Sequence, residues 1–134
     1  MIELSPSLIA AIRGEGEKSY PDECCGFLLG SERAVKELVP VINAREDGER
    51  YHRFRIEPDE FMRTELAARK KKLDIVGFYH SHPDHPAAPS EYDREHALPC
   101  YSYIIVAVEK GRACKMTSWL LAESRSEFTE EKIV

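Results

Sequence analysis

The stretch Asp74-Ile75-Val76-Gly77-Phe78-Tyr79-His80, followed directly by Ser81-His82-Pro83, decides the fold. Its first seven residues form a mostly apolar run, which is typical of a buried central strand. A loop rich in proline, alanine and histidine comes next, and a short helix is expected from about Ser90 to Leu98. The sequence therefore predicts a strand that carries two histidines at its end.

Two further helices are expected before this strand in the sequence. Ser5-Pro6 provides an N-cap followed by proline at the first helical position, and the glycines at 14 and 16 weaken that helix toward its end. Pro58 opens the other helix, with acidic residues in its first turn and cations at its close. Met62, Leu66 and Leu73 recur at helical spacing and predict a single apolar stripe.

Further strands are expected where apolar or alternating residues are bounded by turn residues. They are Cys24–Gly30, Val35–Ile42, Tyr51–Ile56 after a polar turn at Asn43–Arg50, and a hairpin of Tyr103–Glu109 with Ala113–Leu121 around Lys110-Gly111. This order of helices and strands predicts a mixed α/β (α+β) fold in which helices pack on a sheet. At 134 residues we expect one domain over residues 1–134.

Composition excludes several classes of protein. The net charge of −5 argues against nucleic-acid binding, and the longest apolar stretch, Ile104–Val108, is too short to cross a membrane. No signal peptide is evident, so the four cysteines are expected to be reduced thiols in the cytoplasm. Cys24 and Cys25 head an apolar run and are interpreted as small core residues rather than nucleophiles.

His80 and His82 lie two residues apart, so an extended strand points both side chains to the same face. Ser90 is a candidate N-cap, which places the Asp93 carboxylate in the first turn of a helix that can face back toward the strand. Two imidazoles and one carboxylate suit a catalytic zinc ion that keeps a fourth position for water. Ferrous iron accepts the same ligands, whereas calcium and magnesium prefer all-oxygen sites.

Hydrolysis by a metal-bound water also needs a base and a group that stabilises the oxyanion. Asp22, Glu23 and Glu91 are all candidate bases, and Glu23 is favoured because it stands where a loop enters a buried strand. An exposed charge at a strand entry is its alternative role. The Ser90 hydroxyl either caps the helix, stabilises the oxyanion, or does both at different stages. The remaining histidines are interpreted as surface or core residues: His52, His85 and His96.

These residues together resemble a known family. His80-Ser81-His82, seven residues, Ser90, two residues and Asp93 reproduce the H-x-H-x7-S-x2-D pattern of the JAMM/MPN+ metalloproteases, with Glu23 as the upstream glutamate. The similarity is greatest to small prokaryotic members and spans essentially the whole chain. It implies a curved mixed sheet flanked by helices, similar in outline to cytidine deaminases. The deaminase signature of HxE and PCxxC is absent, so deamination of nucleobases is not expected.

The resemblance also implies roles for the motif residues. His80, His82 and Asp93 would hold one zinc ion per chain, Glu23 would be the general acid and base, and Ser90 would stabilise the tetrahedral intermediate. Family members hydrolyse the amide or isopeptide bond after the C-terminal Gly-Gly of ubiquitin or ubiquitin-like proteins.

The segment between Asp93 and the strand at Tyr103 is too short for the insertions that grip a second ubiquitin. The implied partner is therefore a small β-grasp protein such as a sulfur carrier, with no nucleic acid or membrane involved. The alternative is a non-catalytic MPN-type scaffold or binding module. The intact motif favours the enzyme, and an iron-dependent redox enzyme is a weaker possibility.

Overall fold

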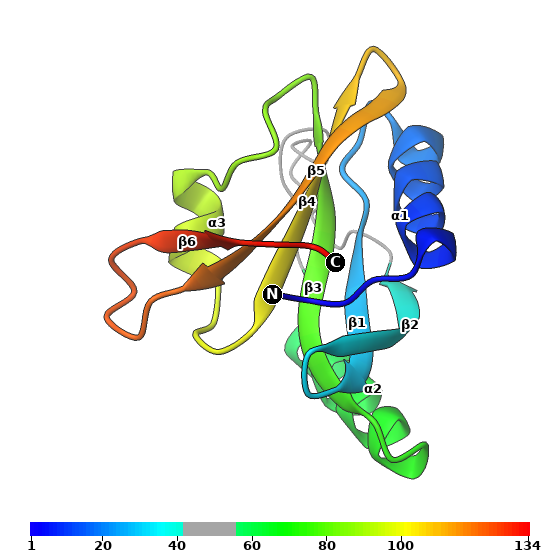
Figure 1. The fold of residues 1–134 in the computed structure, drawn as a ribbon, viewed down its shortest axis with the longest axis vertical. Helices are drawn as coiled ribbons and strands as arrows, with labels where there is room; N and C mark the ends of the chain where they lie inside the picture. Colours follow the sequence, from blue (N-terminus) through cyan, green and yellow to red (C-terminus); the bar gives the residue numbers. More distant parts are fainter. Residues whose placement is uncertain (42–55) are drawn as a thin grey trace.

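The computed structural model describes residues 1–41 and 56–134, where a six-stranded sheet carries three helices (Figure 1). The helices are α1 (Pro6–Ser19), α2 (Pro58–Lys70) and α3 (Glu91–His96). The strands are β1 (Cys25–Ser31), β2 (Ala34–Val41), β3 (Asp74–Pro83), β4 (Ser102–Glu109), β5 (Arg112–Leu121) and β6 (Phe128–Glu131). Their spatial order is β2-β1-β3-β4-β5-β6, which confirms the expected mixed α/β fold.

Strand β3 lies at the centre of the sheet. It pairs antiparallel with β1 and parallel with β4, and α3 lies in the crossover between β3 and β4. Gly77 allows the two parallel strands to approach, because a Cβ atom there would lie 2.1 Å from the backbone oxygen of Ser102. The parallel pairing requires the chain to leave β3 and return, and that crossover brings the loop and α3 over the end of β3.

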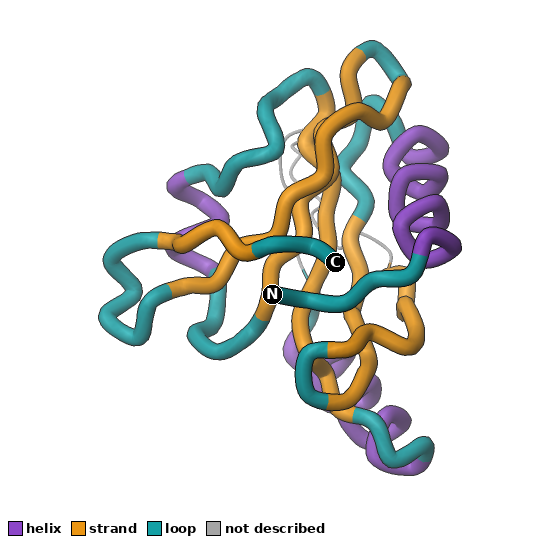
Figure 2. Tube along the Cα trace, viewed as in Figure 1, coloured by secondary structure: helices purple, strands orange, loops and turns teal. Residues whose placement is uncertain are grey.

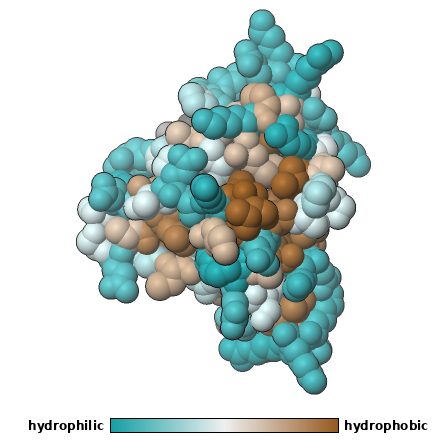
Figure 3. All heavy atoms as spheres, in the orientation of Figure 1, coloured by the Kyte–Doolittle hydropathy of each residue, from teal (hydrophilic) through white to brown (hydrophobic). Residues whose placement is uncertain are grey.

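The helices lie beside the sheet (Figure 2), and each face of the sheet buries apolar side chains. Helix α1 covers one face, where Tyr79, Ile104 and Val106 are buried. Phe27, Phe78 and Tyr103 lie on the other face with α2. In the view of Figure 3, polar side chains cover the two ends of the molecule, and apolar ones gather near its middle. Within residues 1–41 and 56–134, no helix is long and apolar enough to cross a membrane.

Helix α1 begins as predicted, with the Ser5 hydroxyl accepting a hydrogen bond from the backbone N–H of Leu8. It continues through the glycines to Ser19 because Gly16 packs against β4 and β3. A Cβ at Gly16 would lie only 3.0 Å from a methyl group of Val108. Tyr79 donates a hydrogen bond to the Glu15 carboxylate at 2.7 Å and ties the same turn to the sheet.

The predicted apolar stripe of α2 is wrong for two of its three residues. Met62 and Leu66 are 62% and 52% exposed, and the buried residues of the helix are Thr64 and Ala68. Small side chains are buried because they let the helix pack closely on the sheet, which hydropathy spacing does not reveal. Strand β6 was not predicted, and the expected turn at 43–50 and most of the expected strand at 51–56 lie outside the described residues.

Candidate metal centre

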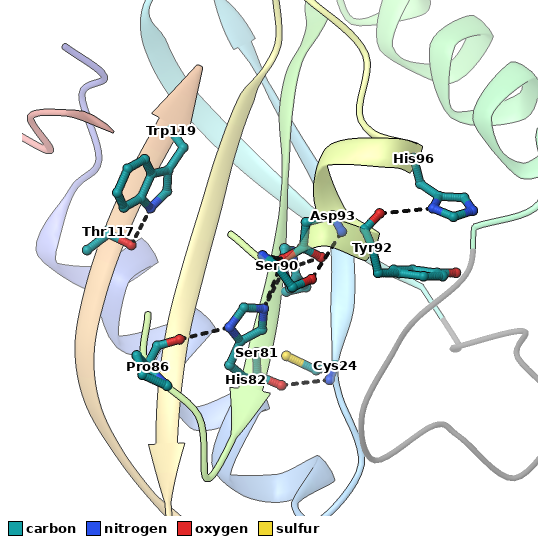
Figure 4. A network of polar contacts seen from close by, with 11 residues as sticks. Cys24, Ser81, His82, Pro86, Ser90, Tyr92, Asp93, His96, Thr117 and Trp119 are labelled. Carbon is teal, nitrogen blue, oxygen red and sulfur yellow. Dashed lines mark hydrogen bonds and ion pairs between the residues drawn. The ribbon is translucent and has the colours of Figure 1, made fainter. Parts of the chain in front are cut away.

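Strand β3 brings two imidazoles together at its end (Figure 4). Because side chains alternate along a strand, His80 and His82 emerge on the same face, and their Nε2 atoms lie 3.1 Å apart. Both residues are buried. The structure therefore provides two ring nitrogens that converge on one point, as the spacing predicts.

Asp93 reaches the same point from the first turn of α3. Ser90 caps this helix: its hydroxyl accepts from the Asp93 backbone N–H at 3.1 Å, and its own backbone N–H donates to Asp93 Oδ2 at 2.8 Å. This reciprocal capping box fixes the carboxylate in space. Oδ2 lies 3.1 Å from His82 Nε2, and Oδ1 lies 3.4 Å from His80 Nε2.

The spacing of these atoms fits a tetrahedral metal site. Ligand atoms about 2.0–2.1 Å from a tetrahedral zinc ion are separated from one another by roughly 3.3 Å. The Nε2 atoms of His80 and His82 lie 3.1 Å apart, and each lies near a different oxygen of the Asp93 carboxylate, at 3.4 and 3.1 Å respectively. In residues 1–41 and 56–134 this is the group of histidine and acidic side chains that is close enough to share an ion. The donor set therefore fits the group that the sequence pattern implies.

Local electrostatics favour the forms of these residues that bind metal. Burial lowers the pKa of His80 and outweighs the opposing influence of Asp93, so the imidazole is neutral near pH 7. Burial would raise the pKa of Asp93, but charge and hydrogen bonds from neighbouring imidazoles, where these are protonated, lower it overall. A neutral imidazole and an ionised carboxylate are the protonation states that coordinate a divalent cation.

The tautomer of His82 follows from a backbone contact. Its Nδ1 atom lies 2.8 Å from the carbonyl oxygen of Pro86. A carbonyl oxygen only accepts, so Nδ1 carries a hydrogen, and in a neutral ring with this hydrogen the lone pair is on Nε2. That lone pair faces His80 and Asp93.

Glu23 is buried and directly precedes the point where β1 joins β3. The backbone N–H of Ser81 donates to the Cys24 carbonyl at 3.1 Å, and the Cys24 N–H donates to the Ser81 hydroxyl at 2.8 Å. Cys25 pairs with His80, and Glu23 lies two residues before Cys25, outside the strand. Its carboxylate is not one of the three clustered ligands.

A second contact links the Glu23 loop to the loop after His82. Asp84 accepts a hydrogen bond from the Tyr20 hydroxyl at 2.6 Å and another from the Lys110 backbone N–H at 2.8 Å. The Tyr20 hydroxyl lowers the pKa of this exposed carboxylate. The segment that leads to the candidate base is thus joined directly to the loop that follows the candidate ligand His82.

The other candidate residues lie away from the cluster. Asp22 and Glu91 are exposed, and Glu91 pairs with Arg94 on its own helix. His85 and His96 are exposed, and His52 lies outside the described residues. Cys24 and Cys25 are buried free thiols, and burial raises the pKa of Cys24 to about 11 and shifts that of Cys25 in the same direction. Both thiols therefore stay protonated, as core residues do.

An open pocket of about 660 Å³ adjoins the cluster and includes His80 and Asp93 in its wall. The rest of its lining is largely apolar and comes from α2, α3 and the sheet: Ile56, Glu57, Pro58, Phe61, Phe78, Tyr92, His96, Ala97, Leu98 and Tyr103. The sequence prediction missed this pocket because its residues are far apart in the chain. The available signal was the aromatic content of the segments that flank the motif.

A family profile described as prokaryotic homologs of the JAB domain matches residues 5–122. The chain belongs to this family. The match confirms the resemblance to small prokaryotic JAMM/MPN proteins that the motif predicts. The aligned region extends from the N-cap of α1 to the residue after β5, so it contains all the candidate site residues.

Individual relatives agree with this assignment. The chain is 35% identical over 102 residues to the desampylase of Haloferax volcanii, in an alignment that covers 74% of this chain and 72% of that protein. It is 25% identical over 136 residues to the CysO-cysteine peptidase of Mycobacterium tuberculosis, which covers 99% of this chain and 90% of the peptidase.

Two solved structures share the fold. A solution structure of a protein from Salinibacter ruber is 41% identical, with a TM-score of 0.77 over 100% of this chain and 90% of that one. A JAB1/MPN domain protein from Archaeoglobus fulgidus is 20% identical, with a TM-score of 0.60 over 100% and 97% of the two chains. The latter likeness shows the fold alone.

Proposed function

We propose that this protein is a zinc-dependent peptidase or isopeptidase that hydrolyses the bond after the C-terminal Gly-Gly of a ubiquitin-like or sulfur-carrier protein. The observation that carries the proposal is the convergence of the His80 and His82 Nε2 atoms, 3.1 Å apart, on the Asp93 carboxylate, whose two oxygens lie 3.1 and 3.4 Å from them. The names of the relatives, a desampylase and a CysO-cysteine peptidase, support a hydrolase. We place the protein in the cytoplasm, where buried free thiols such as Cys24 and Cys25 stay reduced.

His80, His82 and Asp93 would hold one zinc ion per chain. A bound zinc ion supplies a Lewis acid and lowers the pKa of water to roughly 7. Glu23 takes a proton at its carboxylate and later delivers it to the leaving amine. Ser90 donates its hydroxyl hydrogen to the oxyanion of the tetrahedral intermediate. Capping α3 does not prevent this, because one hydroxyl both accepts and donates.

The environment of the cluster suits an extended tail that ends in glycines. The side chains of His80 on β3 and Asp93 on α3 are buried in the wall of an open, largely apolar pocket. A substrate backbone without side chains can approach such recessed groups, and only glycine provides this. The apolar wall offers contact to side chains that precede the tail, and the acidic net charge of −5 gives no support to a nucleic-acid partner.

The Glu23→Gln variant tests the proposal. We expect it to bind one zinc ion per chain, measured by elemental analysis, because Glu23 is not a ligand. Its rate of cleavage should fall by about 10²–10⁴ because the general base is lost. The substrate is a β-grasp carrier with residues appended after its Gly-Gly, and the products are identified by mass spectrometry.

Asp22→Asn and Glu91→Gln are matched controls, since both remove an exposed acid close to the motif in sequence. Both should retain activity. Full activity of Glu23→Gln would show that another group is the base. A wild-type protein that binds zinc and yet cleaves none of a panel of such carriers would instead indicate the binding-module alternative.

A further inference from the structure

The loop between β3 and α3 is held by two consecutive carbonyl groups that face different elements. The carbonyl of Pro86 accepts from His82 Nδ1 at 2.8 Å (Figure 4). The carbonyl of Ala87 accepts from the Thr117 hydroxyl of β5 at 2.6 Å. Ala87 is buried against Ile105 and Ala107 of β4. The loop is therefore fixed between a candidate metal ligand and a strand two positions away in the sheet.

Thr117 lies in the same row of the sheet as the metal cluster. It pairs with Ile105, which in turn pairs with His80, so the three side chains emerge on one face. Thr117 is 4% exposed. Its oxygen also accepts a hydrogen bond from the Trp119 indole N–H at 2.8 Å, which leaves its hydroxyl hydrogen for Ala87. This second bond sets the direction in which the hydroxyl donates.

From this geometry we infer that Thr117, supported by Trp119, is a positioning residue for the metal centre. The inference rests on the proposed function, since it concerns the same metal site. By anchoring Ala87, Thr117 holds the adjacent Pro86 carbonyl against His82, which keeps the hydrogen on Nδ1 and the lone pair on Nε2. Groups that orient a ligand from outside the coordination sphere typically change metal affinity by about 10–100-fold when removed.

The anchor also acts on the third ligand. The loop leads directly from Ala87 to Ser90, the N-cap of α3, whose backbone N–H binds the Asp93 carboxylate. A loop released from β5 would lose the fixed starting point of that helix. Thr117 thus restrains two of the three ligands, His82 and Asp93, without touching either the metal position or the substrate.

Thr117→Val removes the hydroxyl and keeps a β-branched side chain of similar size, which a strand tolerates. We expect the zinc dissociation constant, measured by competition with a chromogenic chelator, to rise by about tenfold. Thr117→Ser keeps the hydroxyl and should restore affinity to within about threefold of wild type. Trp119→Phe removes the supporting N–H together with part of the ring and should weaken binding less than Thr117→Val.

A second measurement reports the tautomer itself. In the metal-free protein, nitrogen chemical shifts of the imidazole rings distinguish a hydrogen on Nδ1 from one on Nε2. Wild-type His82 should show the Nδ1–H form, and Thr117→Val should show a mixture of the two. If Thr117 only added stability, its substitution would lower the midpoint of unfolding and leave the tautomer of His82 unchanged.

Ser118→Ala is the matched control. Ser118 is the next residue of β5, is fully buried, and donates its hydroxyl to Glu131 at 2.8 Å on the opposite face. This variant loses a buried hydrogen bond but should bind zinc within about twofold of wild type. The inference is overturned if Thr117→Val binds zinc as tightly as wild type, or if Ser118→Ala weakens binding equally. If the wild type itself binds no zinc, the metal site fails, and the tautomer measurement alone decides the role of Thr117.

Discussion

Two carboxylates with almost fully buried side chains, Asp93 and Glu131, lie on opposite faces of the sheet and have different partners. The side chain of Glu131 is 5% exposed and that of Asp93 is 7% exposed. Glu131 accepts hydrogen bonds from the hydroxyls of Ser102 and Ser118 at 2.7 and 2.8 Å and from the guanidinium of Arg33. Asp93 instead faces two imidazole nitrogens, at 3.1 and 3.4 Å.

This difference indicates that the Glu131 carboxylate stabilises the fold, whereas the Asp93 carboxylate is placed to bind a cation. Every partner of Glu131 named above is a donor by its chemistry, so that carboxylate is satisfied within the protein. The imidazole of His82 has its hydrogen on the far nitrogen and presents a lone pair to Asp93. Lone pairs that converge on a carboxylate leave a place for a cation, whereas hydroxyls and a guanidinium fill it.

The largest effect that tests this comparison is expected from replacing each acid by its amide. Asp93→Asn should weaken zinc binding by about 100-fold or more, because a neutral amide is a poor ligand. This loss exceeds the effect of about 10–100-fold that is usual for groups outside the coordination sphere. Glu131→Gln should bind zinc as the wild type does. Elemental analysis and chelator competition measure both, and equal zinc occupancy in the two variants would remove Asp93 from the ligand set.

The second largest effect is expected on the free energy of unfolding. Glu131→Gln should lower the free energy of unfolding by about 2 kcal/mol, because hydrogen bonds to a charged group are worth roughly 1.5–3 kcal/mol each and the amide retains part of them. Urea denaturation of the metal-free proteins measures this. Metal-free Asp93→Asn should be destabilised less, since its imidazole neighbours are not fixed donors. The reverse order would show that Asp93 is the structural acid.

The contribution of Glu131 should depend on pH. Burial raises its pKa, but the hydroxyls of Ser102 and Ser118 and the charge of Arg33 outweigh burial, so the pKa is lowered overall. A carboxylate with a lower pKa in the folded state stabilises the protein above its unfolded pKa, about 4.3, and less as the pH falls through the folded value. The stability difference between wild type and Glu131→Gln should shrink below that pH. A difference that grows on acidification would mean that the pKa is raised.

The smallest effect is expected from removing one donor to Glu131. Ser102→Ala should cost about 1 kcal/mol, less than Glu131→Gln, because Ser118 and Arg33 remain bound to the carboxylate. Its zinc affinity should equal that of the wild type. Thermal unfolding with and without zinc separates these quantities, and a loss larger than that of Glu131→Gln would contradict the shared network.

The sequence predicted the ligand cluster because its geometry is local. A two-residue period along β3 and the Ser90 capping box fix the side chains of His80, His82 and Asp93 with few long-range contacts. It did not predict β6, which is short and carries three polar residues among its four, including Glu131. The partners of Glu131 come from residues 33, 102 and 118, and no local pattern relates those positions.

The stripe of α2 failed for a related reason. The buried residues of α2 are the small Thr64 and Ala68, whereas its large aliphatic side chains Met62 and Leu66 are exposed. The spacing of apolar residues identifies a candidate buried face of a helix. The distance between the helix and the sheet decides which side chains fit between them. That distance is set by the sheet as a whole. The role of Thr117 was missed in the same way, since it depends on a loop 30 residues earlier.

Asp84 links three segments of the chain that lie at one end of the molecule. One carboxylate binds the Tyr20 hydroxyl on the segment that leads to Glu23 and the Lys110 backbone in the β4–β5 turn, and it belongs to the loop that follows His82. Three turns at this end of the molecule are therefore joined by the hydrogen bonds of one exposed carboxylate. We therefore expect displacements of these three turns to be coupled, so that crystals of different forms should show correlated shifts.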